Sequence, residues 1–162
     1  MREKEMKKKA VIFDIDGTLA NCDHRIHHIK KNPKDWDGFF SDMKKDSLNE
    51  GIASIYRKFI LDKNIEVLVV TGRPIKYKED TIFWFHDNQL MYHPVGDSKY
   101  KPFFFFRAND DFTDDDIMKK KIYNEQMKNK YEVLFVIEDR QRVVEMWRSL
   151  GLTCLQCEKG DF

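Results

Sequence analysis

A short apolar run that ends in two aspartates constrains this chain more than any other feature. Residues 10–13 are apolar and largely β-branched or aromatic, as in a buried strand, and Asp14 and Asp16 follow together with Gly17 and Thr18. Because alternate residues of an extended chain point the same way, both carboxylates face one point just beyond the strand. Open α/β sheets place their chemistry at that edge. The run therefore predicts a divalent cation site, an acid/base pair, or both.

The composition fits one soluble domain. The chain has 162 residues, of which 41% are hydrophobic and 35% charged, enough to bury a core. No apolar segment is long enough to span a bilayer, and the charged N-terminus lacks the apolar stretch of a secretory signal. Three cysteines are too few for a disulfide framework and favour a reducing cytoplasm. We expect one domain over residues 1–162, with a flexible tail at 1–8 and a flap or cap insertion at 21–45.

Strand-like and helix-like segments alternate along the chain. Four helices are expected. The first begins at a capping box at Ser47 and ends at Asn64, and the second covers residues 76–90. The third begins at a cap at Thr113 or Asp116 and runs to about Lys130, and the fourth covers residues 140–150 with Gly151 as its C-terminal cap. Strands are expected at 10–13, 65–70, 103–106, 133–137 and 152–156. This alternation predicts an α/β fold with a mainly parallel sheet and helices on both faces.

Polar residues follow three of the expected strands and converge at one edge of a parallel sheet. They are Asp14 and Asp16, Thr71 and Arg73, and Glu138 and Asp139. Phosphoryl transfer needs a nucleophile, neutralisation of charge around the phosphoryl group, and an acid for the leaving oxygen. We expect Asp14 to be the nucleophile, ionised through a bound Mg²⁺, and Asp16 to protonate the leaving oxygen and later activate water. Both aspartates are also assigned to the metal site.

The remaining polar residues complete this hypothesis. Asp139 is expected to bind the Mg²⁺ and Glu138 to hold a metal-bound water, since Mg²⁺ prefers hard oxygen ligands. The Thr71 hydroxyl is expected to hold phosphoryl oxygens, and Lys119 to offset the carboxylates. Asp115 lies four residues before Lys119 on an expected helix, so the two side chains share a face and can pair.

These residues resemble the signature motifs of the haloacid dehalogenase superfamily of phosphatases. The sequence Asp14-Ile15-Asp16-Gly17-Thr18 resembles the first motif, and Thr71, Lys119 and Glu138-Asp139 resemble the second, third and fourth in the same order. A closer resemblance is to the 3′-phosphatase domain of phage-type polynucleotide kinase/3′-phosphatases. It rests on Thr71-Gly72-Arg73, on Arg107 followed by Asp115-Asp116-Ile117-Met118-Lys119, on Val143-Val144-Glu145-Met146-Trp147-Arg148, on Gly151 and on the ending Gly160-Asp161-Phe162.

The resemblance implies a Rossmann-like fold, a Mg²⁺ cofactor and removal of 3′-phosphates from polynucleotide ends through an aspartyl-phosphate. It also implies substrate-binding roles for Arg25, Arg73 and Asp115. At position 138 this chain has Glu138 where the phage enzymes have aspartate. No GxxxxGK[ST] motif occurs in the 162 residues, so kinase activity is not expected from them and a separate kinase or ligase is a possible partner.

Two other functions fit the same residues: a nucleotidase for free 3′- or 5′-mononucleotides, and a non-catalytic module that binds phosphorylated ends. Near-neutral net charge, +1, leaves room for the first. For several other residues a purely structural role is expected rather than a functional one. His24, His27 and His28 are expected to decorate a flap rather than bind zinc, Cys154 and Cys157 to be plain thiols, and residues 103–106 to form a buried strand. The aromatic residues Trp36, Phe39 and Phe40 either close a small satellite core or stack on a nucleobase.

Overall fold

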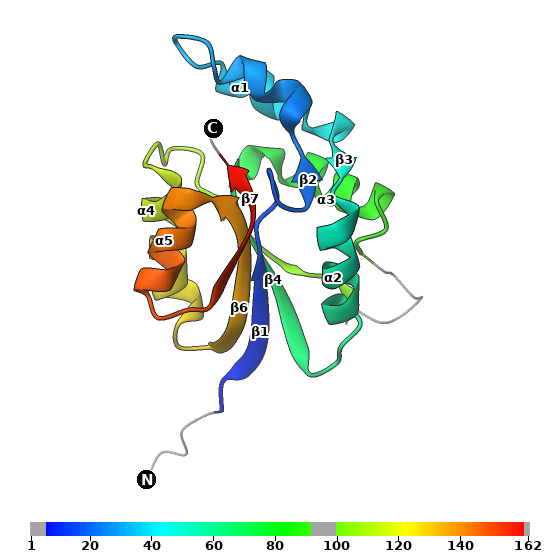
Figure 1. Cartoon of the computed structure of the whole chain (residues 1–162), viewed down its shortest axis with the longest axis vertical. Coiled ribbons are helices and arrows are strands. Elements are labelled where there is room, and N and C mark those ends of the chain that lie inside the picture. The colour runs from blue at the N-terminus through cyan, green and yellow to red at the C-terminus, as the bar shows by residue number, and fades with distance from the viewer. Residues whose placement is uncertain (1–5, 92–99, 161–162) are drawn as a thin grey trace.

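A five-stranded parallel sheet runs through the computed structural model, which describes residues 6–91 and 100–160 (Figure 1). The strand order is β5-β4-β1-β6-β7, so the strand that carries the two aspartates is central. The strands are β1 (Lys8–Phe13), β4 (Ile65–Pro74), β5 (Phe103–Arg107), β6 (Tyr131–Arg140) and β7 (Cys154–Gly160). This arrangement confirms the predicted α/β fold. Residues 1–5 of the expected tail lie outside the described residues, and its last residue, Lys8, belongs to β1.

Helices cover both faces of the sheet (Figure 1). One face packs against α2 (Glu50–Ile60) and α3 (Lys78–Asp87), and the other against α4 (Asp115–Ile122) and α5 (Gln141–Ser149). The side chains of β1 alternate between the two layers, which explains why its residues 10–13 are all apolar: Val11 and Phe13 join the first cluster, and Ala10 and Ile12 the second. The site beyond β1 therefore sits on a strand that is fixed from both sides.

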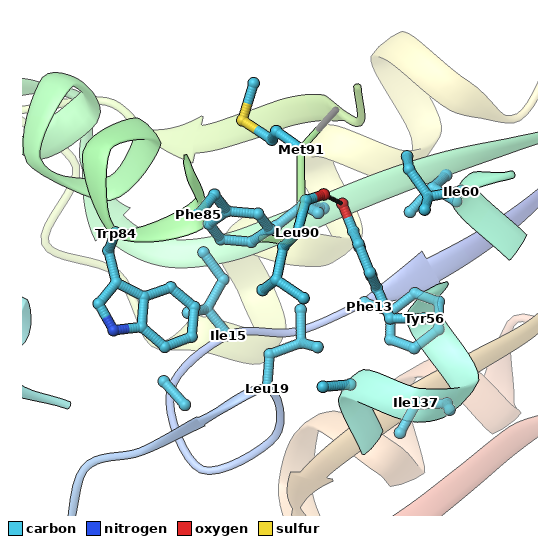
Figure 2. Packing of buried hydrophobic residues seen from close by; sticks show 14 of the residues in the cluster. Phe13, Ile15, Leu19, Tyr56, Ile60, Trp84, Phe85, Leu90, Met91 and Ile137 are labelled. Carbon is cyan, nitrogen blue, oxygen red and sulfur yellow. Dashed lines mark hydrogen bonds between the residues drawn. The ribbon is translucent and has the colours of Figure 1, made fainter. Parts of the chain in front are cut away.

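The cluster beneath α2 and α3 is rich in aromatic side chains (Figure 2). Phe13 packs edge-on against Tyr56, with ring centroids 5.3 Å apart. The Tyr56 hydroxyl donates a 2.9 Å hydrogen bond to the Leu90 carbonyl, so its polar atom has a partner inside the core (Figure 2). Trp84 is also buried and donates its indole N–H to the Asp46 carbonyl at 2.9 Å. This last bond ties the core to the segment above the sheet.

That segment is the insertion, residues 22–46, and it lies beyond the carboxyl edge of the sheet (Figure 1). A two-stranded antiparallel sheet, β2 (Ala20–Asn21) and β3 (Ser47–Leu48), closes its base. It contains the short helices η1 (Asp23–His28), α1 (Trp36–Ser41) and η2 (Met43–Lys45). A small core of its own holds it together, formed by Cys22, Ile29, Phe39 and Phe40. Phe39 and Phe40 thus confirm the satellite-core interpretation, whereas Trp36 is 44% exposed.

Several element boundaries differ from the prediction. Ser47 lies in β3 and is not a helix cap; α2 begins at Glu50 after Asn49 and ends at Ile60, short of Asn64. The N-cap of α4 is Asp114 rather than Thr113 or Asp116. After α4 the chain widens into one π turn, η5 (Tyr123–Met127), and a single 3-10 turn, η3 (Ile75–Tyr77), precedes α3. Gly151 does take the positive φ, +80°, expected after α5.

The strands next to β1 are longer than predicted because they continue through the polar residues that follow their apolar runs. β4 reaches Pro74, which pairs with Arg107, and β6 reaches Arg140, which pairs with Gly160. The strand at 103–106 lies at the edge of the sheet and is only partly buried: Phe103 is 51% exposed, which corrects the buried-strand expectation. Among the described helices none has both the length and the apolar character needed to cross a bilayer.

Candidate active site

A pocket of about 750 Å³ opens at the carboxyl edge of the sheet. Its size is that of a site for a small ligand. Residues from four strand ends, from α4 and from the insertion line it, including Asp14, Asp16, Trp36, Gly72, Arg107, Asp115, Lys119, Glu138, Asp139 and Arg140. The predicted convergence of distant motifs on one crevice is therefore present in the structure.

Asp14 lies at the floor of this pocket. Its backbone N–H donates to the Ile137 carbonyl at 3.1 Å, which extends the pairing of β1 with β6 by one residue and fixes the start of the turn. Asp14 is 5% exposed as a residue, and its Oδ1 accepts a 2.7 Å hydrogen bond from the Lys119 ammonium. A second bond of 2.7 Å joins Lys119 to Glu138, so the lysine bridges the ends of two neighbouring strands.

Three buried carboxylates form an acidic cluster: Asp14, Glu138 and Asp139. One oxygen from each lies within 4.8 Å of the others, and this is a group of hard oxygen ligands of the kind that Mg²⁺ prefers. Lys119 is the ammonium that pairs with the cluster. Three carboxylates facing one ammonium carry an excess of negative charge in a buried place.

Burial and the excess negative charge of the acidic cluster shift the pKa values of Asp14 and Asp139. Burial, followed by the charge of Glu138, raises the pKa of Asp14 from 3.8 to about 7. Burial and the charges of Asp14 and Glu138 raise the pKa of Asp139 to about 9. Burial alone would lower the pKa of Lys119, but the neighbouring carboxylates outweigh burial and raise it, so the lysine stays charged. A divalent cation among these oxygens would neutralise the excess and restore the ionised forms.

Two glycines allow the chain to close around Asp139. Gly17 has a φ of +87°, and a Cβ there would overlap the Asp139 carboxylate; a Cβ at Gly160 would overlap the same oxygen. Thr18 donates its hydroxyl to Asp139 at 3.2 Å. The Gly17-Thr18 part of the first motif thus packs against the fourth motif, a role that the sequence pattern alone did not reveal.

A second group of buried charges, the arginine cluster, consists of Arg25, Arg73, Asp16 and Asp46. Arg25 donates to Asp16 at 2.5 Å and to Asp46 at 2.6 and 2.7 Å. Arg73 donates to Asp16 at 2.6, 3.1 and 3.2 Å and approaches Asp46 at 3.4 Å. Burial would raise the pKa of Asp16, but the two guanidinium groups outweigh burial and hold it well below its usual range.

This cluster contains three of the predicted site residues, Arg25, Arg73 and Asp16. Arg25 and Arg73 have no exposed surface and do not line the described pocket; both donate hydrogen bonds to Asp16, which does line it. The Asp16 side chain is turned to these arginines and is not part of the acidic cluster, so its carboxylate is not placed as a metal ligand. Asp46 was missed in the sequence because it follows Lys44 and Lys45 in a polar stretch and resembles a surface residue.

The structure also gives the contacts of Thr71 and Asp115. Thr71 is fully buried and its hydroxyl accepts the backbone N–H of Arg73 at 3.2 Å, which places it beneath the wall of the described pocket rather than on it. Asp115 does not pair with Lys119. It pairs with Arg107 and, at 2.7 Å, with Arg140, both of which line the pocket. Arg107 also donates to the Gly72 carbonyl at 3.0 Å.

The structure places His24 and His28 beside carboxylates and leaves the cysteines unpaired with one another. Within the described residues no histidine belongs to a group that could hold a metal. His24 contacts Asp46 at 2.8 Å, and His28 lies between Asp35 and Asp42 at 3.1 and 3.3 Å. The three cysteines are free thiols.

Comparison with known proteins gives one consistent result. The family profile described as "Polynucleotide kinase PNKP phosphatase domain" matches residues 8–162. The chain is 26% identical over 144 residues to a protein of Autographa californica nuclear polyhedrosis virus named "Putative bifunctional polynucleotide kinase/RNA ligase". It is 30% identical to chains in two solved structures, "Structure of the Pnkp1/Rnl/Hen1 RNA repair complex" and "Structure of Pnkp1/Rnl/Hen1 complex", each with a TM-score of 0.78.

These matches cover nearly all of this chain but only part of its relatives. The viral match covers 89% of this chain and 18% of the viral protein. The structural matches cover 96% and 98% of this chain and 44% and 48% of the solved chains. The chain belongs to the haloacid dehalogenase-type phosphatase domain family of the polynucleotide kinases.

Proposed function

We propose that this chain removes 3′-phosphates from polynucleotide ends in a Mg²⁺-dependent reaction that passes through a phosphorylated Asp14. The observation that carries the proposal is the position of Asp14 at the floor of a pocket, with Lys119 on its Oδ1 and two more carboxylates beside it. The family supports a phosphatase on polynucleotide ends.

In the first half of the reaction a carboxylate oxygen of Asp14 attacks phosphorus. The bond between phosphorus and the 3′-oxygen breaks, and that oxygen leaves with a proton. In the second half, water attacks the phosphorus of the aspartyl-phosphate, releasing inorganic phosphate and the free carboxylate. Lys119 holds the nucleophile in place and, 2.7 Å from Asp14, lies close enough to offset charge on the transferred group.

The acidic cluster fits a magnesium ion, because it offers closely spaced, buried carboxylate oxygens with more negative charge than Lys119 balances. Asp14, Glu138 and Asp139 would hold the ion. When bound, it would keep Asp14 ionised and neutralise charge on the phosphoryl oxygens.

Asp16 is the proposed acid and base. The arginine cluster favours its ionised form, which is the form that accepts a proton from the attacking water. Its acid form, needed for the leaving oxygen, is favoured while the substrate is bound, because the negative charge of the phosphate raises the pKa of a neighbouring carboxyl and Asp16 then takes up a proton from solvent. Arg25 and Arg73 therefore act on the reaction by orienting Asp16, with Asp46 completing their hydrogen bonds.

The test compares three substrates at equal concentration: a 3′-phosphorylated oligonucleotide, the same oligonucleotide with a 5′-phosphate, and a 3′-phosphorylated mononucleotide. We expect release of inorganic phosphate to be fastest from the first, to stop with EDTA and to return with Mg²⁺. Equal rates on all three would replace the proposal with a general nucleotidase. Binding of the 3′-phosphorylated oligonucleotide with no phosphate release in Mg²⁺ would indicate a non-catalytic module.

A further inference from the structure

Two aromatic side chains at the pocket take no part in the chemistry above. Trp36 of α1 is 44% exposed and Phe112 is 90% exposed, and both line the pocket. They come from distant parts of the chain, the insertion and the loop 108–114 that joins β5 to α4. Figure 1 shows α1 and this loop at the same end of the sheet.

The loop that carries Phe112 is held by hydrogen bonds on both sides of that residue. Arg107 donates to the Asp111 carbonyl at 3.1 Å and to the Thr113 carbonyl at 2.6 Å. Arg107 also pairs with Asp115, so the loop is anchored to α4. A large apolar ring is thus presented to solvent by a braced backbone, although burial would have stabilised it.

Trp36 is fixed by packing. It stacks on Phe40 at 6.0 Å between ring centroids and meets Phe39 edge-on at 5.9 Å, and both phenylalanines are buried. The Lys34 ammonium lies 5.4 Å from the centroid of the indole, which places a positive charge beside the exposed part of the ring.

A chain of hydrogen bonds along the pocket rim joins the two elements. The Asn109 side chain in the Phe112 loop accepts the Lys76 backbone N–H at 2.9 Å. The Lys76 ammonium then donates to Asp37, the neighbour of Trp36, at 3.0 Å, and the Tyr77 hydroxyl donates to the same carboxylate at 3.1 Å. These bonds connect the loop that carries Phe112 to the helix that carries Trp36, and both rings line the same pocket.

We propose that Trp36 and Phe112 form a stacking platform for unpaired nucleobases at the 3′ end of a single-stranded polynucleotide. The inference rests on the proposed function, which brings the terminal phosphate to Asp14. It adds that the preferred substrate is single-stranded at its 3′ end. Aromatic rings beside cationic groups bind single strands by stacking, with little dependence on sequence. Bases inside a duplex are already covered by their neighbours, so a recessed or blunt duplex end is a poorer substrate.

The kinetic test uses Trp36→Ala and Phe112→Ala, with Phe83→Ala as the matched control, since Phe83 is 60% exposed on α3 and does not line the pocket. The substrates are a 3′-phosphorylated single strand and the same strand with its last two positions abasic. For each platform variant we expect kcat/KM on the normal strand to fall by about 5- to 150-fold. The ratio between normal and abasic strands should fall toward one, while Phe83→Ala keeps the wild-type ratio. Unchanged ratios in both platform variants would overturn the inference.

A binding test separates this inference from the phosphatase activity. Trp84 and Trp147 are 1% and 0% exposed, so quenching of tryptophan fluorescence by an added oligonucleotide reports mainly on Trp36. With Asp14→Asn, we expect saturable quenching by the 3′-phosphorylated single strand, weaker quenching by a blunt duplex, and loss of the signal on adding Trp36→Phe. Quenching that survives Trp36→Phe would overturn the platform. Single-strand quenching by a wild-type protein that releases no phosphate would sustain the platform and refute the proposed function.

Discussion

Two groups of buried charges meet at the carboxyl edge of the sheet, and they differ in balance. In the acidic cluster three carboxylates share one ammonium, Lys119. In the arginine cluster two carboxylates, Asp16 and Asp46, face the guanidinium groups of Arg25 and Arg73. Asp14 and Asp16 are two residues apart, yet each belongs to a different cluster.

This difference in balance separates the two aspartates chemically. Burial among like charges raises the pKa of Asp14 to about 7, whereas the arginines hold the pKa of Asp16 well below its usual range. A buried cluster with excess negative charge is stabilised by binding a cation or a proton. A buried cluster with equal numbers of positive and negative groups already has its charges paired. We infer that the first is the reactive site and the second the rigid support that aims Asp16.

The largest expected effect comes from Asp14→Asn. Phosphate release should fall by about 10⁴-fold or more, because the amide cannot replace the nucleophile. The same substitution removes one of the crowded carboxylates, so the free energy of unfolding without Mg²⁺ should rise rather than fall. Steady-state phosphate release and urea denaturation in EDTA measure the two effects. Near-normal turnover on a 3′-phosphorylated oligonucleotide would refute the assignment of Asp14.

Asp46→Ala should have the opposite effect on stability. It leaves two buried guanidinium groups with Asp16 as their remaining carboxylate in the cluster, and breaking such a buried pair costs about 3–5 kcal/mol. Urea denaturation measures the loss as a lower midpoint. The control is Asp87→Ala, at an exposed position at the end of α3, which should change stability by no more than about 0.5 kcal/mol. A loss below about 1 kcal/mol for Asp46→Ala would show that the cluster is not a support.

The acidic cluster could be predicted from the sequence because strand ends carry it. An apolar run followed by Asp14 and another followed by Glu138 and Asp139 are local patterns, and a parallel sheet brings their ends together whatever lies between. Lys119 also reaches this edge from the expected helix, although its partners are Asp14 and Glu138 rather than Asp115.

The arginine cluster could not be predicted in the same way. Its geometry depends on how the insertion folds back over β1, and no periodic pattern encodes that path. Asp46 reaches Arg25 only because β2 and β3 bring the two ends of the insertion together. The resemblance implies phosphate contacts for these two arginines, and no local pattern in the sequence indicates that both of them also meet the buried carboxylate of Asp46.

A third prediction concerns pH. The pKa values of Asp14 and Asp139, about 7 and about 9, lie above the ordinary value of 3.8, so the folded state binds more protons than the unfolded state over this range. Without a divalent cation, the free energy of unfolding contributed by these groups should therefore fall as pH rises from about 4 to about 9. Mg²⁺ binds the ionised carboxylates, so the rise in Tm on adding Mg²⁺ should be larger at about pH 8 than at about pH 5. An equal rise at both pH values, or a larger one at the lower pH, would contradict the excess-charge interpretation.

The smallest effect is expected at an ion pair on the surface. Lys44 of η2 and Asp80 of α3 lie 2.8 Å apart, a distance close to the 2.6 Å between Arg25 and Asp46, but their side chains are 51% and 40% exposed. Water and salt screen this pair in the folded state as well as in the unfolded state. The coupling energy between Lys44→Ala and Asp80→Ala in a double-mutant cycle should therefore be about 0.2–1 kcal/mol, and it should be smaller in high salt. Since the two pairs have similar distances, only burial and the number of partners distinguish them. A coupling energy as large as the one expected for the arginine cluster would mean that distance alone sets the strength of an ion pair. Burial would then not distinguish the arginine cluster from a surface pair.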